Sequence, residues 1–130
     1  MSLKINNIVK KVLILFGSTL VSDHDLTNGL EQFFDVIPCN KENKIWHIFE
    51  KRTIHIILIE VSQNKAIFEL LIKVHEKYPD MPIIAIGNKN HSEIAAQAFF
   101  VGVWDYFRIP YHRDLLVERA RVLASKKESF

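Results

Sequence analysis

The feature that most constrains this chain is a regular alternation between short apolar runs and longer amphipathic stretches. Five short stretches are typical of β-strands: residues 12–16, 35–38, 54–61, 82–87 and 104–107. Two of them, Val12–Phe16 and Ile54–Val61, are almost entirely apolar, which predicts strands buried on both faces of a sheet. The intervening stretches carry apolar residues at helical spacing, and we expect helices over residues 22–34, 42–51, 66–78, 90–101 and from 110 to about 125.

Five strands that alternate with five helices predict a three-layer α/β sandwich, a (βα)5 arrangement in which helices cover both faces of a parallel five-stranded sheet. Because crossover connections are right-handed, few topologies remain, and the flavodoxin-like strand order 2-1-3-4-5 is the commonest at this length. We expect Pro38 to end the second strand, and Asp23 and Asp25 to cap the helix that starts near Ser22.

The composition is that of one globular domain without a strongly charged surface. The chain has 130 residues, with 17 basic and 15 acidic side chains and a formal net charge of +2. This balance argues against direct nucleic-acid binding by the domain. No apolar run reaches the roughly 18 to 20 residues that cross a bilayer, and the first residues do not resemble a signal peptide. With a single cysteine, Cys39, these features predict a cytoplasmic domain without membrane contact.

The topology also predicts where function resides. Ligands of open parallel sheets bind beyond the carboxyl ends of the strands. Four segments would meet at that edge: Phe16–Ser18, Glu60–Gln63, Gly87–Lys89 and Arg108–Tyr111.

Two stretches near this edge carry a familiar pattern. Residues Gly102–Tyr111 read Gly-Val-Trp-Asp-Tyr-Phe-Arg-Ile-Pro-Tyr, and Pro79–Ile84 read Pro-Asp-Met-Pro-Ile-Ile. The first resembles the G-A-x-D-Y-L-x-K-P-F segment of the receiver domains of bacterial two-component response regulators, and the second resembles the entry to their fourth strand. The agreement in element order covers about residues 10 to 125. It implies one receiver-like domain over residues 1–130, a non-enzymatic signal-transduction module that is either the N-terminal part of a longer protein or a stand-alone adaptor.

The residues that carry out phosphorylation in that family are all replaced here. The resemblance matches Phe16 and Gly17 to two magnesium-binding acids, Glu60 to the phosphate-accepting aspartate, Gly87 to a hydroxyl residue and Ile109 to a lysine. Without the acids, magnesium loses most of its ligands, and without the hydroxyl and the lysine, phosphoryl oxygens lose a donor and a counter-charge. The resemblance therefore implies an atypical receiver with a degenerate pocket at Phe16, Gly17, Gly87 and Ile109. It implies no cofactor and no phosphorylation by the usual Asp/Mg route.

Two residues near this pocket have alternative interpretations. Glu60 is either a mimic of a phosphorylated aspartate or a solvated carboxylate at the end of a strand. Tyr106 matches the family's aromatic switch position, and because Gly87 offers it no hydroxyl, we favour a fixed inward ring over a switch.

The residues that could bind a ligand leave alternative functions open. Gly17–Thr19 follows the first strand and resembles, weakly, the phosphate-binding loop of a flavodoxin, so a small protein that binds FMN or another phosphate ligand is the second hypothesis. No two of the six histidines share a helical turn, which argues against a preformed metal site, and Cys39 is expected to be a buried inert thiol. A weakly polar ligand in the degenerate pocket is a further alternative.

We expect the partner to be an output domain, such as one that regulates transcription, or a separate protein bound by a stand-alone adaptor. The expected surface is the face formed by the helix at 90–101, the strand at 104–107 and the final helix, which also suits a homodimer. Adjacent helical residues lie about 100° apart, so with Phe99 packed inward beside Ala95 and Ala96, Phe100 is left at the flank. Together with Trp104 it would form an exposed aromatic interaction surface.

Overall fold

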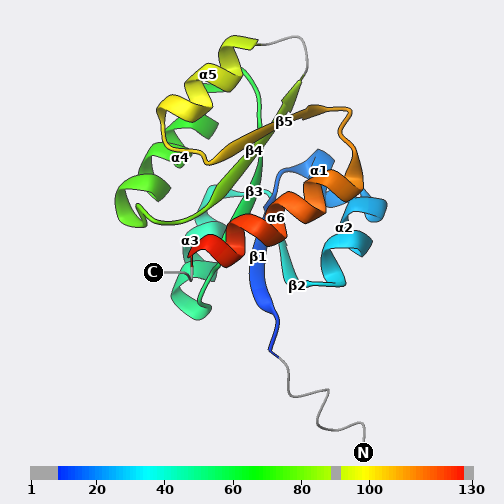
Figure 1. Ribbon diagram of the computed structural model, residues 1–130. Helices are drawn as coiled ribbons and strands as arrows, with labels where there is room; N and C mark the ends of the chain where they lie inside the picture. Colours follow the sequence, from blue (N-terminus) through cyan, green and yellow to red (C-terminus); the bar gives the residue numbers. More distant parts are fainter. Residues whose placement is uncertain (1–8, 89–91, 128–130) are drawn as a thin grey trace, which may run out of the picture.

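The computed structural model describes residues 9–88 and 92–127, and within them the strands form one parallel sheet (Figure 1). The strands are β1 (Lys11–Phe16), β2 (Phe34–Cys39), β3 (Ile56–Val61), β4 (Ile83–Asn88) and β5 (Asp105–Ile109). Their order is β2-β1-β3-β4-β5, which confirms the predicted flavodoxin-like topology.

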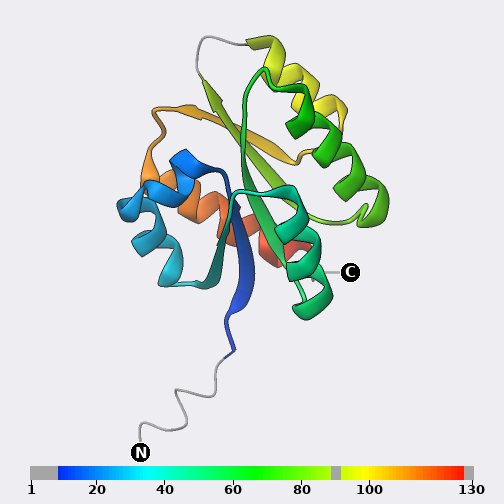
Figure 2. The same cartoon turned by 180° about the vertical axis from the view of Figure 1, so that it is seen from behind.

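Within the described residues, six helices cover the two faces of this sheet, and Figures 1 and 2 show these faces from opposite sides. The helices are α1 (Ser18–Ser22), α2 (His24–Glu31), α3 (Glu42–Lys51), α4 (Lys65–Lys77), α5 (Ser92–Phe100) and α6 (Arg113–Lys127). Helices α3, α4 and α5 lie on one face, and α1, α2 and α6 lie on the other. The expected three-layer sandwich is therefore present.

Alternation along the central strands supplies both cores. In β1, Leu13 and Leu15 pack toward α1, α2 and α6, whereas Ile14 and Phe16 pack toward α3, α4 and α5. All four side chains are at most 5% exposed. Because both faces of each inner strand are buried, continuous apolar runs are required there, as the sequence predicts.

The first helical stretch differs from the expectation of one helix over residues 22–34. Asp23 ends α1 and caps α2, where its carboxylate accepts a hydrogen bond from the Leu26 amide at 3.1 Å. Phe34 begins β2, because its backbone pairs with Lys11 of β1. The capping role of Asp23 was predicted, but the interruption and the early strand depend on tertiary pairing that helical periodicity does not report.

The ends of two strands also differ from the prediction. Pro38 does not end β2 but lies inside it, opposite Leu15, and Cys39 is the last residue of the strand. An edge strand tolerates proline because one side of its backbone has no ladder to form. Strand β3 begins at Ile56 rather than Ile54, because the His55 Nδ1 accepts the Val12 amide hydrogen at 2.9 Å in place of a backbone carbonyl.

Some expectations fall outside the described residues. The predicted helix start at Asn90, Lys89 after β4, and the last three residues of the chain are among them. Within the described residues, none of the helices has the length and apolar character that a bilayer crossing requires.

Candidate functional site at the carboxyl ends of the strands

Glu60, at the end of β3, lies directly over Gly17, which follows β1. A Cβ atom on Gly17 would lie 2.5 Å from the Cβ of Glu60 and 2.6 Å from its Oε1, and Gly17 has a φ of 126°. The backbone conformation and the close approach both require glycine at this position. The Thr19 amide donates a hydrogen bond to Glu60 Oε1 at 3.0 Å. The partly buried Glu60 side chain is thus folded back across the β1–α1 turn.

Tyr106 occupies a similar position over Gly87. A Cβ atom on Gly87 would overlap the Tyr106 hydroxyl and would lie 3.0 Å from Val61 Cγ2. The ring turns inward and packs against the core beneath α3, α4 and α5. Its hydroxyl oxygen is buried, and among the described residues it has no hydrogen-bond partner. Burial raises the pKa of Tyr106, and the nearby Arg108 charge opposes that shift in part.

The remaining two residues of the predicted pocket face away from each other. Phe16 is 5% exposed and belongs to the core under α3, α4 and α5, whereas the half-buried Ile109 packs against the core under α1, α2 and α6. Ile109 is paired in register with Asn88 of β4. The structure therefore brings Phe16, Gly17, Gly87 and Ile109 to one edge of the sheet, but the side chains of Glu60 and Tyr106 take the space above the two glycines.

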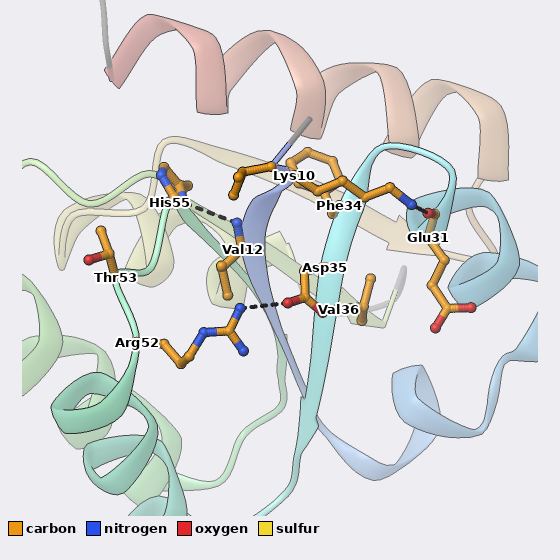
Figure 3. A pocket seen from close by; sticks show the side chains of 10 residues that line it. Lys10, Val12, Glu31, Phe34, Asp35, Val36, Arg52, Thr53 and His55 are labelled. Atoms are coloured by element: carbon orange, nitrogen blue, oxygen red, sulfur yellow. Dashed lines mark hydrogen bonds and ion pairs between the residues drawn. The ribbon is translucent and has the colours of Figure 1, made fainter. Parts of the chain in front are cut away.

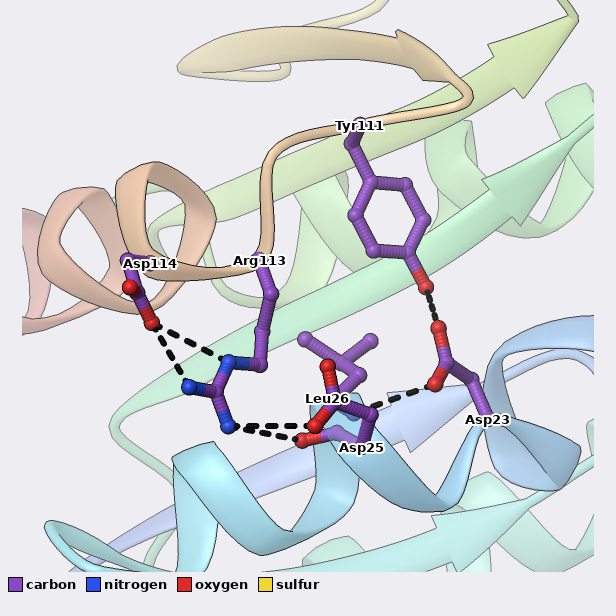
Figure 4. Close-up of polar contacts among 6 residues, drawn as sticks. All are labelled: Asp23, Asp25, Leu26, Tyr111, Arg113 and Asp114. Atoms are coloured by element: carbon purple, nitrogen blue, oxygen red, sulfur yellow. Dashed lines mark hydrogen bonds and ion pairs between the residues drawn. The ribbon is translucent and has the colours of Figure 1, made fainter.

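A second polar cluster joins the start of α2 to the segment after β5 (Figure 4). The Tyr111 hydroxyl donates a hydrogen bond to Asp23, whose other oxygen accepts from the Leu26 amide. The hydrogen bond from Tyr111 is the main cause that lowers the pKa of Asp23. Burial, followed by the bond to Asp23, raises the pKa of Tyr111. We did not predict this contact from the sequence, although Tyr111 belongs to a segment expected at this edge.

Arg113 at the start of α6 strengthens the same junction. Its guanidinium lies 3.3 Å from the Asp25 carboxylate on α2 and 2.9 Å from Asp114 on its own helix. Helices α2 and α6 approach closely there: a Cβ atom on Gly29 of α2 would lie 3.3 Å from Arg113 Cδ and from Val117 Cγ2 of α6. Asp25 therefore contributes to the contact between α2 and α6.

The two aromatic residues of the expected interaction surface lie on different sides of the sheet. Phe100 is 92% exposed and borders α4, whereas Trp104 is half-buried and packs against the core on the α6 side. Phe99 does not pack inward as expected and is 49% exposed. Ile94 and Ala98, one turn apart, form the inner stripe of α5, which turns Phe99 by about 100° away from the core.

A hollow of about 630 Å³ lies at the opposite edge of the sheet, at the amino ends of β1, β2 and β3 (Figure 3). Arg52 forms an ion pair with Asp35 at 2.5 Å, and the Lys10 ammonium donates to the Glu31 carbonyl oxygen at 2.7 Å. The cationic groups of this hollow are therefore engaged with neighbours in the same protein. Throughout the part of the chain that the structure describes, no three histidine, cysteine, aspartate or glutamate side chains are grouped to hold a metal ion.

A scan against protein-family models and a search of curated protein sequences gave no match. Solved structures do match. A CheY-like response regulator receiver domain from Methanospirillum hungatei JF-1 is 20% identical with a TM-score of 0.77, and the alignment covers 93% of this chain and 98% of that chain. NtrX from Brucella abortus, solved in complex with ADP, is 18% identical with a TM-score of 0.76, and the alignment covers 91% of this chain but 28% of NtrX.

A third match is an atypical orphan response regulator described as having a phosphorylation-independent regulatory mechanism. It is 18% identical with a TM-score of 0.73, and the alignment covers 87% of this chain and 94% of that one. These likenesses extend over nearly all of the described sheet and helices. The chain therefore has the fold of the receiver domains of response regulators.

Proposed function

We propose that this chain is a non-enzymatic, receiver-like signalling module of the cytoplasm that acts through protein contacts and takes no phosphoryl group by the Asp/Mg route. The observation that carries the proposal is the contact of Glu60 with Gly17 and Thr19. At the position matched to the phosphate acceptor, a carboxylate is already hydrogen-bonded to the Thr19 amide and folded over the glycine that replaces a magnesium-binding acid.

The residues matched to a magnesium-binding acid and to the lysine supply neither a metal ligand nor a cation for phosphoryl transfer. Transfer needs an exposed acceptor oxygen in line with the leaving group, a metal ion and cationic stabilisation of the phosphoryl oxygens. Phe16 is buried in an apolar core, and Ile109 packs in the opposite one. Neither side chain can hold a cation or neutralise an anion.

The same contacts favour a constant conformation over a switch. Glu60 is anchored by the Thr19 amide, and the Tyr106 hydroxyl takes the place that a side chain at position 87 would need. We propose that Glu60 has a structural role in closing this edge, and that Tyr106 is held inward whatever the signal. Signalling would then depend on when the module meets its partner.

For the partner, we propose an output domain or a separate protein that contacts α5, β5 and α6. Two large apolar side chains are exposed there, Phe99 at 49% and Leu115 at 62%. Aromatic side chains are enriched at protein interfaces, so Phe99 is the residue of this face best suited to a contact with a partner. The NtrX chain, of which the aligned part is 28%, is an example of a much longer protein that contains this fold.

The first prediction concerns phosphorylation. After incubation with acetyl phosphate and Mg²⁺, intact-mass spectrometry should show the unmodified mass, because no described residue at this edge combines an open acceptor oxygen with a metal site. A functional receiver domain treated in parallel provides the positive control. A stoichiometric gain of one phosphoryl group, lost in Glu60→Gln, would contradict the proposal.

The flavin alternative receives no support from the geometry of the β1–α1 turn. The Thr19 amide, one of the donors that a phosphate there would need, is bound by Glu60, whose negative charge would repel the ligand. A colourless purified protein whose absorbance does not change with added FMN is the result that we expect.

A further inference from the structure

An apolar groove separates α4 from α5 on the outer surface of the molecule. It has a volume of about 640 Å³, and its apolar lining comes from Phe68, Ile72, Ala96, Phe100 and Val101. Phe100 is 92% exposed and Ile72 is 41% exposed, so a nearly bare aromatic ring stands at the edge of an apolar hollow. Monomeric proteins rarely leave such a combination uncovered.

We propose that this groove binds the same groove of a second copy of the chain, with the Phe100 ring of each copy seated in the hollow of the other. A two-fold interface joins identical patches, so the patch must be complementary to itself. A protruding ring beside a hollow meets that requirement, because a two-fold rotation places the ring of each copy in the hollow of the other. This inference does not rest on the proposed signalling role.

The charges at the border of the groove are also complementary to themselves. Lys65 and Glu69 both line it and lie one helical turn apart on α4. When two α4 helices meet antiparallel about a two-fold axis, Lys65 of each copy faces Glu69 of the other. The groove therefore offers one cation and one anion to a partner that offers the same pair, whereas an acidic or a basic partner would meet a like charge.

The area available fits a dimer of ordinary size. A buried aromatic side chain contributes roughly 150–250 Å² of a standard interface of about 800 Å² per partner. Phe100 alone, exposed over 92% of its surface, can supply about a quarter of that area. Ile72, Phe68 and the flanks of α4 and α5 supply apolar surface around it.

The test is the oligomeric state of the whole chain, measured by sedimentation velocity up to about 1 mM. We expect the mass to rise from monomer to dimer with concentration, and Phe100→Glu to raise the dimer Kd about thirtyfold or more. Val9→Glu is the matched control, because it places the same charge on a 90% exposed apolar residue just before β1, outside the groove. It should leave the Kd unchanged, and the melting temperature of each variant shows that it is folded.

A charge exchange tests the two-fold geometry itself. Lys65→Glu and Glu69→Lys should each dissociate the dimer, because each places like charges opposite one another. An equimolar mixture of the two variants should associate again as a heterodimer, since every facing pair is then opposite in sign. A parent that stays monomeric throughout, a dimer that Phe100→Glu does not weaken, or a mixture that does not associate would each overturn the proposal.

Discussion

Gly87 and Tyr106 form a pair in which the absence of one side chain makes room for another. The Tyr106 hydroxyl stands where a Cβ on Gly87 would be, yet among the described residues this buried oxygen has no hydrogen-bond partner. A buried polar group without a partner costs about 1–3 kcal/mol of desolvation. The ring therefore contributes packing to the site, while its hydroxyl opposes folding.

The second prediction follows from that balance. Tyr106→Phe should raise the free energy of unfolding by about 1 kcal/mol, because it removes the unpaired hydroxyl and keeps the ring. Gly87→Ala should lower it by about 1–3 kcal/mol in the parent and by less in the Tyr106→Phe background, where the overlap is relieved. Urea unfolding of the four proteins of this cycle measures both effects.

The matched control is Tyr111→Phe, the same change at a tyrosine whose hydroxyl donates to Asp23. It should destabilise the protein, whereas Tyr106→Phe should not. An equal cost of Gly87→Ala in both backgrounds would show that the hydroxyl does not fill the space above Gly87.

At the scale of elements, Asp23 has two roles, and only one of them was predicted from the sequence. It caps α2 through the Leu26 amide, and it accepts the Tyr111 hydroxyl from the segment that connects β5 to α6. With Arg113 and Asp25, this contact holds the start of α6 against the start of α2. The cap was predictable because its signal is local. The tie to Tyr111 was not, because 88 residues separate the partners.

The third prediction is the pH dependence of this tie. The pKa of Asp23 lies below its ordinary 3.8 in the folded protein, so the unfolded chain binds more protons as the pH falls below that value, and the stabilisation is lost there. The pKa of Tyr111 lies above its ordinary 10.0, so the unfolded chain releases its proton first, and stability falls as the pH rises above 10.0. Between these limits the tie is intact.

Tyr111→Phe should therefore unfold about 1–2 kcal/mol more easily than the parent at neutral pH, with a smaller difference below about pH 4 and above about pH 10. Thermal melts across this range measure it. Asp23→Asn, which keeps an oxygen acceptor at the cap of α2, is the control for loss of the cap. A difference that does not change with pH would show that the tie depends on packing and not on the charge of Asp23.

The prediction of elements succeeded where the chain is buried on both faces and was less accurate where local and tertiary preferences compete. β1, β3 and β4 are continuous apolar runs, and their order followed from the handedness of crossovers. The sequence-based predictions that the first helix extends to residue 34 and that Phe99 is buried were both wrong. Each outcome depends on which neighbour the residue meets in space. Helical spacing identified α5 but could not tell which of two adjacent phenylalanines faces the core.

For the whole molecule, the predicted degenerate pocket is filled by packed side chains. Phe16 fills one core and Ile109 the other, while Gly17 and Gly87 admit the side chains of Glu60 and Tyr106. The family resemblance proposed these positions from the sequence alone. It could not reveal that two neighbouring side chains would close over the glycines, because that depends on how β1, β3, β4 and β5 bring their ends together.

The fourth prediction tests this integration by restoring the family's residues together. A variant with Phe16→Asp, Gly17→Asp, Glu60→Asp, Gly87→Thr and Ile109→Lys should fail to fold cooperatively at neutral pH. Phe16→Asp buries a charge in an apolar core, Gly17→Asp forces a side chain onto a φ of 126°, and Gly87→Thr overlaps the Tyr106 hydroxyl. Each change costs about 1–3 kcal/mol or more, and a domain of this size has about 5–15 kcal/mol in total.

Circular dichroism during urea unfolding measures the outcome, and Glu60→Asp alone is the control that should remain folded. Adding Tyr106→Phe to the restored variant should recover part of the loss, since it removes the overlap at position 87 but leaves the buried charge at position 16. A restored variant that unfolds at the urea concentration of the parent and takes up phosphate from acetyl phosphate would show that the phosphorylation site is latent. The cores around Phe16 and Ile109 would then have to be far more adaptable than their burial indicates, because a packed interior yields little to a change in volume or charge.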